Sequence, residues 1–370
     1  MPDAAKVPPA PRASPRWGVA TALPGDVALA DVPALCRAIQ DCGIDVLHVP
    51  ESVHDSFLVA LLALQSTTTL RVRTSLTVAL PRSPMVTALA AWDLVEVSGG
   101  RFELGLGSQV RGNIVDRYSS QWSDPAAQMR DYFHAVRAIF AAFERRTGLT
   151  YEGPYYRFTR LQPLFTPRDH GYGPPRLVAG GVGPRMCRVA GEVADEFVAH
   201  PTASHPEVVR QQILPRLTEG VLAAGRQDRP GITVVPWCLT GIDHAAIESE
   251  RARIRRELSV LFSTPAYHRT LTLLGHPDVG AQLHALSRER RWSELAEAMP
   301  ATLVADLVPE GTYDQIARIL TTRYDGLCDT VALPLPPALV SAPQQPPTHI
   351  LDGFASAIAE LHRQVASGPA

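Results

Sequence analysis

Eight short apolar segments, separated by longer amphipathic stretches, constrain the fold of this chain most strongly. The first is 17–21 (WGVAT) and the last is 330–336 (TVALPLP), and the others are 45–50, 70–80, 101–107, 176–181, 195–200 and 232–241. Strands that run parallel need helical crossovers of the kind that the intervening stretches predict. Because eight such units close into a filled cylinder, the sequence predicts a single (β/α)8 TIM barrel, with a doubly wound open sheet as the alternative.

Local signals mark several of the predicted elements. Ser83 and Pro84 are typical of a helix start, and a glycine pair at 99–100 is typical of its end. The connection after the fourth strand predicts a helix over 125–144 and a small hairpin in YEGPYYRF, at 151–158. This connection and the one after the seventh strand are long, so the barrel is expected to carry insertions there.

The segments outside the barrel differ from it in composition. Residues 1–15 are rich in Pro and Ala, which predicts a disordered leader before a barrel over 16–336. A Pro-rich link follows at 337–347. The remaining segment, 348–370, is predicted to form a helix over 348–364 that packs on the outside of the barrel, and then a tail.

Composition excludes several classes of partner. The 370 residues are 45% hydrophobic, and 35 Lys and Arg balance 37 Asp and Glu, so no bulk charge favours nucleic acid. No run resembles a signal peptide or a membrane span, which predicts a cytoplasmic protein without a membrane partner. The five cysteines are scattered and predict buried thiols in a reducing compartment, with neither a disulfide framework nor a metal site.

The fold predicts where the functional site lies, because barrels of this type place it at the C-terminal ends of their strands. That rule selects Glu51 to Asp55, Ser75 to Val78, Gly107 to Asn113, Gly180 to Pro184, and His200.

The loop after the fourth strand combines small and polar residues. Gly105 and Gly107 precede a polar group that contains Ser108, Gln109, Arg111 and Asn113. Glycines allow a planar ring or a phosphate to approach the backbone, and the polar side chains can then bind it. The alternative is that the glycines only form tight corners of the barrel.

The segment AGGVGPR, at 179–185, lies between the fifth strand and a helix expected to begin near Pro184. Free amides at a helix N-terminus, preceded by small residues, can bind an anion. A purely structural turn is equally compatible with the sequence.

Two histidines lie at predicted strand ends. Glu51, His54 and Asp55 share one loop after the second strand, and a carboxylate near an imidazole can support acid and base chemistry. A solvated loop is the alternative. His200 ends the sixth strand, where a hydrogen-bonded core histidine is the alternative to a functional one.

Taken in order, these segments resemble the bacterial luciferase-like family. The resemblance spans about 17–336 and is carried by GIDVLHVPES at 43–52, by the stretch from RTSLTV to GLGSQ at 73–109, and by AGGVGPRMCRVAGEVADEFVAH at 179–200. The segments PRSPMVTA, GLGSQVRGNI and STPAY (263–267) are most similar to the sequences of actinobacterial oxidoreductases that use the deazaflavin coenzyme F420.

The resemblance implies a hydride carrier across the C-terminal mouth of the barrel. Positions matching the ring and ribityl contacts are Ser75, Leu76, Val78, Ser108, Gln109 and Asn113, and those matching the phosphate contacts are Gly181, Val182, Gly183 and Pro184. It also implies a cis peptide bond between Ser75 and Leu76. Relatives often have an acidic residue directly followed by His after the second strand, whereas here Ser52 follows Glu51.

From this we expect Glu51 to contact the cofactor and, with His54 as acid or base, to form the catalytic pair. The predicted activity is coenzyme F420-dependent hydride transfer to or from an unidentified small organic substrate. A reduced-FMN-dependent monooxygenase of the same family is one alternative, and a non-catalytic binding or scaffold barrel is another. A homodimer is possible, since the family commonly dimerises.

Overall fold

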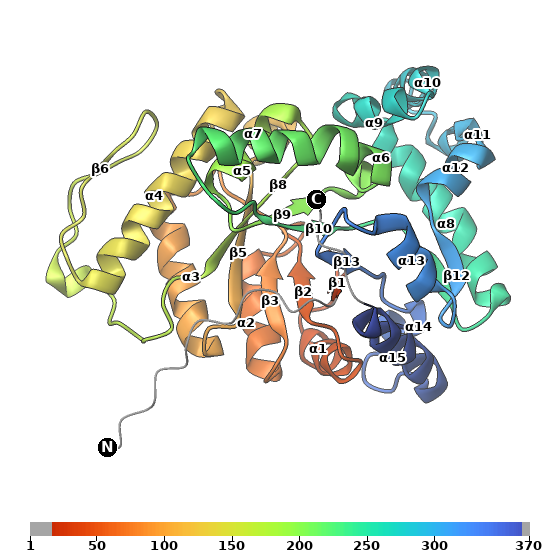
Figure 1. The fold of residues 1–370 in the computed structure, drawn as a ribbon, viewed down its shortest axis with the longest axis horizontal. Coiled ribbons are helices and arrows are strands. Elements are labelled where there is room, and N and C mark those ends of the chain that lie inside the picture. The colour runs from red at the N-terminus through yellow and green to blue at the C-terminus, as the bar shows by residue number, and fades with distance from the viewer. Residues whose placement is uncertain (1–16, 365–370) are drawn as a thin grey trace.

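A closed barrel of eight parallel strands lies at the centre of the molecule (Figure 1). The computed structural model describes residues 17–364, so the leader predicted over 1–15 lies outside the described residues. In barrel order the strands are β1 (Gly18–Ala22), β2 (Val46–Val49), β3 (Arg71–Thr74), β5 (Phe102–Gly107), β8 (Arg176–Gly181), β9 (Glu196–Ala199), β10 (Gly231–Val234) and β13 (Thr330–Ala332). The pairing of β3 with β5 closes the ring, which confirms the predicted barrel over the open sheet.

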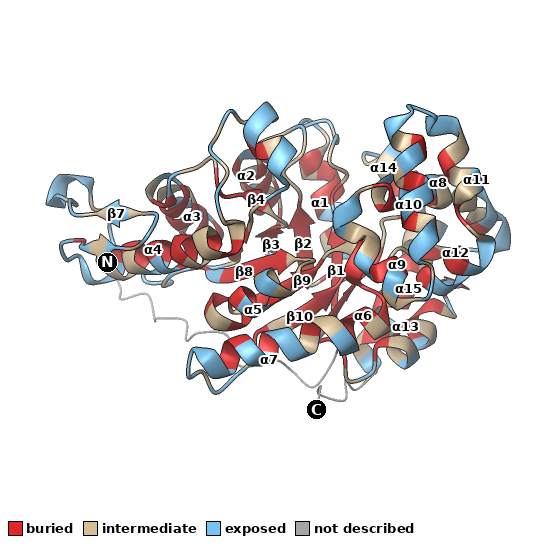
Figure 2. Ribbon diagram, turned by 90° about the horizontal axis from the view of Figure 1, so that it is seen from above, coloured by how far each residue is buried: buried red, intermediate tan, exposed pale blue. Residues whose placement is uncertain are grey.

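Helices surround this barrel and bury their inner faces against it (Figure 2). They are α1 (Val32–Asp41), α2 (Ser56–Ser66), α3 (Pro84–Ser98), α4 (Pro125–Arg145), α5 (Pro184–Val193), α6 (Pro206–Val208), α7 (Leu214–Ala223), α13 (Ile316–Tyr324) and α15 (Thr348–Arg363). A π-helical turn at Val209–Ile213 joins α6 to α7. Within the described residues, no helix is long and apolar enough to cross a membrane.

Capping residues fix where several helices begin and end. Ser83 accepts a hydrogen bond from the Met85 N–H at the start of α3, and Gly99 ends that helix with a φ of 63°. Asp124 caps α4 in the same way. Asp31 is the N-cap of α1, but its side chain makes no capping hydrogen bond.

Two predicted strands are interrupted. The third continues beyond a break as β4 (Thr77–Val78), which also pairs with β5. The predicted seventh strand, 232–241, is wrong in its second half, because Pro236 has no N–H to continue the ladder. Its remaining residues form β11 (Leu239–Gly241), which pairs with β12 (Glu310–Thr312) outside the barrel.

Long insertions follow β5 and β10. The first contains a π-helical turn (Asn113–Arg117), the predicted hairpin as β6 (Tyr151–Glu152) and β7 (Arg157–Phe158), and a 3-10 turn (Pro163–Phe165). The second has its own apolar core, which includes Leu258, Phe262 and Met299. Its helices, on the right in Figure 1, are α8 (His244–Phe262), α9 (His268–Leu273), α10 (Pro277–Arg288), α11 (Leu295–Ala298) and α12 (Ala301–Leu307). A short α14 (Pro337–Ser341) follows β13.

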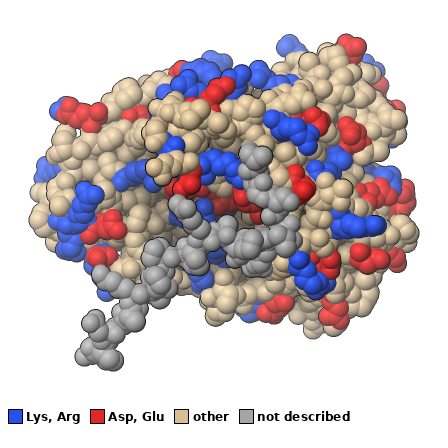
Figure 3. Space-filling model, in the orientation of Figure 1, with Lys and Arg blue, Asp and Glu red and all other residues tan. Residues whose placement is uncertain are grey.

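Charged side chains of both signs are mixed over the face shown in Figure 3. All five cysteines are free and buried, as predicted from their spacing. Among residues 17–364, no group of three or more His, Cys, Asp or Glu side chains is placed to hold a metal ion.

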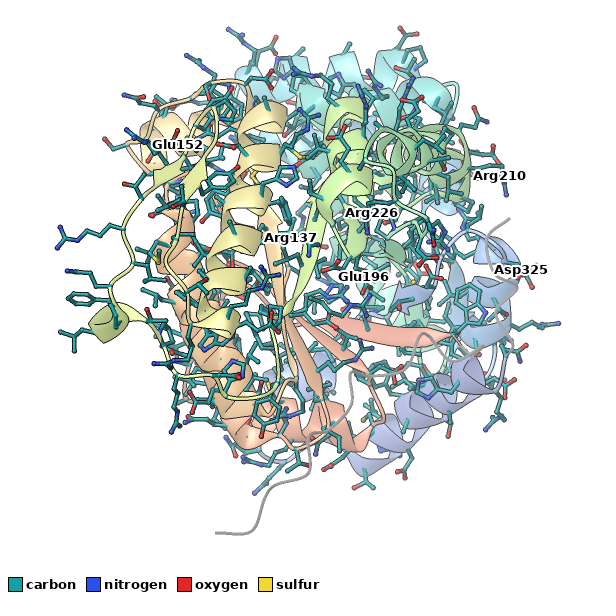
Figure 4. The ribbon with its side chains drawn as sticks, turned by 60° about the vertical axis from the view of Figure 1, so that its left-hand side comes forward. Arg137, Glu152, Glu196, Arg210, Arg226 and Asp325 are labelled. Carbon is teal, nitrogen blue, oxygen red and sulfur yellow. The ribbon has the colours of Figure 1, made fainter. Side chains whose placement is uncertain are left out.

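A buried ionic cluster lies inside the barrel, toward the N-terminal ends of its strands. Arg73 on β3 is fully buried and pairs with Glu103 on β5 and with Glu196 on β9, each at 2.7 Å. Thr233 on β10 donates to Glu196 at 2.8 Å. Figure 4 places Glu196 toward the middle of the molecule, whereas Arg210 and Asp325 lie at its edge. Burial alone would raise the pKa of Glu103, but Arg73 and its neighbouring arginines lower that pKa to about 2.

His48 on β2 lies beside this cluster and is only 2% exposed. Burial, reinforced by the positive charge of Arg73, lowers the pKa of His48 to about 3. Its Nε2 atom has no hydrogen-bond partner among the described residues. His48 is therefore neutral throughout the physiological pH range.

Removing Arg73 should destabilise the barrel far more than removing its neighbour Arg71. Arg73→Met removes the buried guanidinium between Glu103 and Glu196 and leaves these carboxylates only with more exposed arginines, which costs about 3–5 kcal/mol. Arg71 also pairs with Glu103 but is 41% exposed, so Arg71→Met should cost at most about 1 kcal/mol. Urea unfolding of the two variants measures both values, and equal losses would contradict the assignment.

His48 should also make stability depend on pH. Its folded pKa is lowered, so the unfolded state takes up a proton first and stability falls as pH decreases from about 6.5. In His48→Leu, the loss of unfolding free energy between pH 6.5 and 4.5 should be about 2 kcal/mol smaller than in the wild type. Urea titrations at the two pH values test this, and an unchanged loss would show that His48 is not held neutral.

Candidate active site

The predicted site residues other than His200 lie along one half of the barrel mouth. They follow β2, β3, β5 and β8, which are consecutive in barrel order. We call the C-terminal ends of these four strands the first half of the mouth. The second half consists of the ends of β9, β10, β13 and β1, which are also consecutive. The topology therefore brings the predicted residues to one continuous arc.

Glu51 joins the loop after β2 to the end of the third strand. Its side chain is 5% exposed and pairs with Arg82 at 2.8 Å. One carboxylate oxygen also accepts hydrogen bonds from the Val78 N–H at 3.0 Å and from the Ser56 hydroxyl at 3.2 Å. Both oxygens thus engage protein groups, and these contacts give Glu51 a positioning role. Its predicted contact with a cofactor stays a prediction.

The peptide bond between Ser75 and Leu76 is cis, which confirms the expectation from the family resemblance. It separates β3 from β4, and the Leu76 side chain then extends across β5 and β8. A Cβ atom added at Gly107 would lie 3.0 Å from the Leu76 side chain, and one added at Gly180 would lie 2.5 Å from it. At Gly105, a Cβ would lie 1.9 Å from the Thr74 carbonyl oxygen. These three glycines therefore make room for the protein itself, rather than for a ligand.

The polar loop after β5 lies at the surface of the first half. Gln109 has a φ of 59°, and its side chain accepts a hydrogen bond from the next backbone N–H at 2.9 Å. Ser108 donates to the Gln109 carbonyl at 3.2 Å. Asn113 begins the π-helical turn, from which Arg117 donates to the Ser52 carbonyl. This contact ties the loop to the one that follows β2.

The N-terminus of α5 follows β8, the last of the four strands in the first half of the mouth. Gly183 is its N-cap and provides no side-chain cap, and Pro184 is the first helical residue. A Cβ at Gly183 would meet no atom within 4 Å, whereas one at Gly181 would meet Met186 at 2.5 Å. Packing within the protein thus explains why Gly181 has no side chain, but it does not explain the glycine at 183. Uncapped amides beside open space can bind an anion such as a phosphate.

His54 and His200 lie where the two halves of the mouth meet. His54 follows β2, and its Nε2 hydrogen-bonds the Val27 carbonyl, in the loop after β1, at 3.1 Å. A carbonyl only accepts, so the neutral ring carries its proton on Nε2 and leaves Nδ1 as an acceptor. In His200, which follows β9, Nδ1 accepts from the Thr202 N–H at 3.3 Å, so Nε2 carries the proton. One ring is thus arranged to accept a proton and the other to donate a hydrogen bond.

His200 is held in place by a segment whose position here was not predicted from the sequence. Its ring stacks on Tyr267, with centroids 4.7 Å apart and planes at 13°. Tyr267 belongs to the STPAY segment in the insertion after β10. Burial lowers the pKa of His200 to about 4, so the ring is neutral near pH 7. Glu196 and Val198 face the barrel interior, and strand alternation directs His200 to the same side.

A cavity lies in the second half of the mouth. Its volume is 720 Å³, and it is lined by residues after β1, β10 and β13 and by one face of α8. None of the residues predicted to bind a cofactor lines it. The site predicted from the sequence and the cavity are therefore neighbouring regions of one mouth.

Comparison with known proteins places this arrangement in a family. A sequence model of the luciferase-like monooxygenase family matches residues 11–330. The chain belongs to this family.

Three relatives illustrate the range of similarity. An uncharacterised protein of Mycobacterium tuberculosis is 35% identical over 296 residues, covering 80% of this chain and 86% of the relative. A second protein of that organism, assigned as a coenzyme F420-dependent oxidoreductase, is 27% identical over 311 residues, covering 77% of this chain and 84% of the relative. The structure of coenzyme F420-dependent tetrahydromethanopterin reductase from Methanopyrus kandleri matches with a TM-score of 0.73 at 17% identity, covering 90% of this chain and 99% of that chain.

The packing of Leu76 predicts which glycine substitution can be rescued. Gly107→Ala clashes only with the Leu76 side chain, so combining it with Leu76→Ala should recover about 1 kcal/mol relative to the sum of the single effects. Gly105→Ala clashes with the Thr74 backbone and should not be rescued. Unfolding free energies of the five variants measure both couplings, and rescue of both glycines or of neither would refute this packing.

Proposed function

We propose that the protein is an oxidoreductase that transfers a hydride between coenzyme F420 and a small organic substrate. The observation that carries the proposal is the open, uncapped N-terminus of α5 at Gly183, at the C-terminal end of β8 in the first half of the mouth. The 27% identical relative assigned as coenzyme F420-dependent supports the choice of cofactor.

The residues of the first half fit such a cofactor at both of its ends. Gly181, Val182, Gly183 and Pro184 would hold its phosphate, where the amides after the N-cap are free to donate. Ser75, Leu76 and Val78 would support its ring, with Ser108, Gln109 and Asn113 along its polar chain. When bound, a deazaflavin supplies a two-electron carrier that exchanges a hydride with an organic molecule.

The protein's own part is to position the substrate and move a proton. In the direction of alcohol oxidation, the hydride leaves the substrate's carbon with its electron pair, and the hydroxyl proton passes to the Nδ1 atom of His54. The His200 Nε2–H donates a hydrogen bond to the substrate oxygen. Ketone reduction reverses each step. Glu51 acts as a positioning residue through Val78 and Arg82.

The family's description favours one alternative, a monooxygenase that uses reduced FMN in the same half of the mouth. The two candidates share the barrel and the phosphate position, and they differ in the ring and in the use of oxygen. Homodimer formation stays a prediction for either activity.

Titration with the two cofactors tests the proposal. The deazaflavin should bind the wild type, followed by its own fluorescence, with FMN binding more weakly. Gly183→Val should weaken deazaflavin binding by about tenfold or more without lowering the unfolding temperature, because its side chain enters open space where the phosphate would lie. Gly148→Val is the matched control, since Gly148 also has no neighbour within 4 Å, and it should bind as the wild type does.

Tight FMN binding without deazaflavin binding would replace the proposal with the monooxygenase. Binding of neither cofactor would leave a scaffold barrel. Equal affinities of Gly183→Val and Gly148→Val for the deazaflavin would remove the α5 N-terminus from the phosphate site.

A further inference from the structure

The cavity in the second half of the mouth has the size and shape of a binding site for a small molecule. Its 720 Å³ lies within the range of about 300–1,000 Å³ that is typical of ligand pockets. It opens on the mouth between the barrel and α8. Its lining includes Pro201, which follows His200, and Asp26, which precedes Val27, the residue whose carbonyl His54 binds; neither histidine lines the cavity itself. A molecule in it would face the proposed cofactor across the mouth.

The cavity wall is mainly apolar. Aliphatic and aromatic side chains from three strand ends and α8 form it, including Leu23, Val235, Trp237, Ile254, Leu333 and Leu335. An apolar wall of this kind favours ligands that bury hydrocarbon surface.

The charged groups at the cavity disfavour an anion. Asp26, Glu250 and Glu257 line it together with a single cation, Arg253. Arg253 pairs with Glu250 at 2.6 Å and with Glu257 at 2.5 Å, so its charge is already matched by two carboxylates. A phosphorylated or carboxylated molecule would meet excess negative charge and no free cation among the described lining residues.

We infer that this cavity is the substrate site and that the substrate is an uncharged, largely apolar alcohol or ketone. The inference rests on the proposed function, since the first half of the mouth must hold the hydride carrier. The apolar body would occupy the cavity, and its oxygen would reach the mouth between His54 and His200.

Two fluorescent naphthalene probes test the inference. One is an uncharged ketone, 6-propionyl-2-dimethylaminonaphthalene, and the other is the anion anilinonaphthalene sulfonate. The wild type should bind the ketone at least about tenfold more tightly than the anion. Val340→Trp, which adds bulk from α14 to the cavity wall, should weaken ketone binding by about tenfold. Leu164→Trp is the matched control at an 87% exposed site and should leave ketone binding unchanged.

A double variant tests the effect of charge on ligand choice. Replacing Glu250 and Glu257 with Gln frees Arg253, and the double variant should bind the anionic probe about tenfold more tightly than the wild type does. Unchanged anion binding would show that these carboxylates do not select the ligand. Equal binding of the two probes to the wild type, or unaltered ketone binding by Val340→Trp, would overturn the cavity assignment.

The test separates this inference from the proposed function. Val340→Trp should bind the deazaflavin as the wild type does, and the ketone should bind in its presence. If the ketone binds as expected but neither cofactor binds, the proposed function fails. The assignment of the cavity to uncharged, largely apolar ligands then still stands. If the deazaflavin displaces the ketone by competition, the two do not occupy separate halves and the inference fails.

Discussion

The ion pairs of Arg73 are the interaction on which the rest of the structure depends. A guanidinium buried between Glu103 and Glu196 links β3, β5 and β9 across the barrel interior, where an unpaired charge would be very costly. These polar groups lie inside the barrel toward the N-terminal ends of the strands. Toward the C-terminal ends, the strands carry glycines and the Leu76 side chain. Ion pairs thus fill the barrel interior toward the N-terminal ends of the strands, and the packing of Leu76 shapes it toward the C-terminal ends. The mouth at the C-terminal ends can therefore hold the functional site.

The mouth is divided by the order of the strands. Four consecutive strands carry the cis peptide, the polar loop and the uncapped helix, and the other four surround the cavity. His54 and His200 lie at the two boundaries, and both carry the ring proton on Nε2; their backbone partners leave the Nδ1 acceptor of His54 and the Nε2–H donor of His200 for a ligand. The proposed oxidoreductase needs a hydride carrier and a substrate that face each other, with a proton acceptor and a hydrogen-bond donor beside them. In the proposal, one half of the mouth holds the carrier and the other half holds the substrate.

The sequence predicted the barrel because alternation and capping are local signals that a chain carries along its length. It also predicted that the residues after β2, β3, β5 and β8 meet, because parallel strands share one C-terminal edge. It could not predict that Leu76 occupies the space above Gly107, since that contact joins different strands. The stacking of Tyr267 on His200 and the cavity beside α8 were hidden for the same reason, because both depend on where an insertion folds back. Pro236, by contrast, was a visible signal that the seventh strand ends early.

The central claim is that the hydride carrier and the substrate occupy separate halves of one mouth. A crystal structure of the protein soaked with the deazaflavin tests it most directly. Electron density is expected for the ring against Leu76 and for the phosphate at the N-terminus of α5, with the 720 Å³ cavity still open beside it. Density for the ring inside that cavity, between the end of β10 and α8, would rule out this division of the mouth.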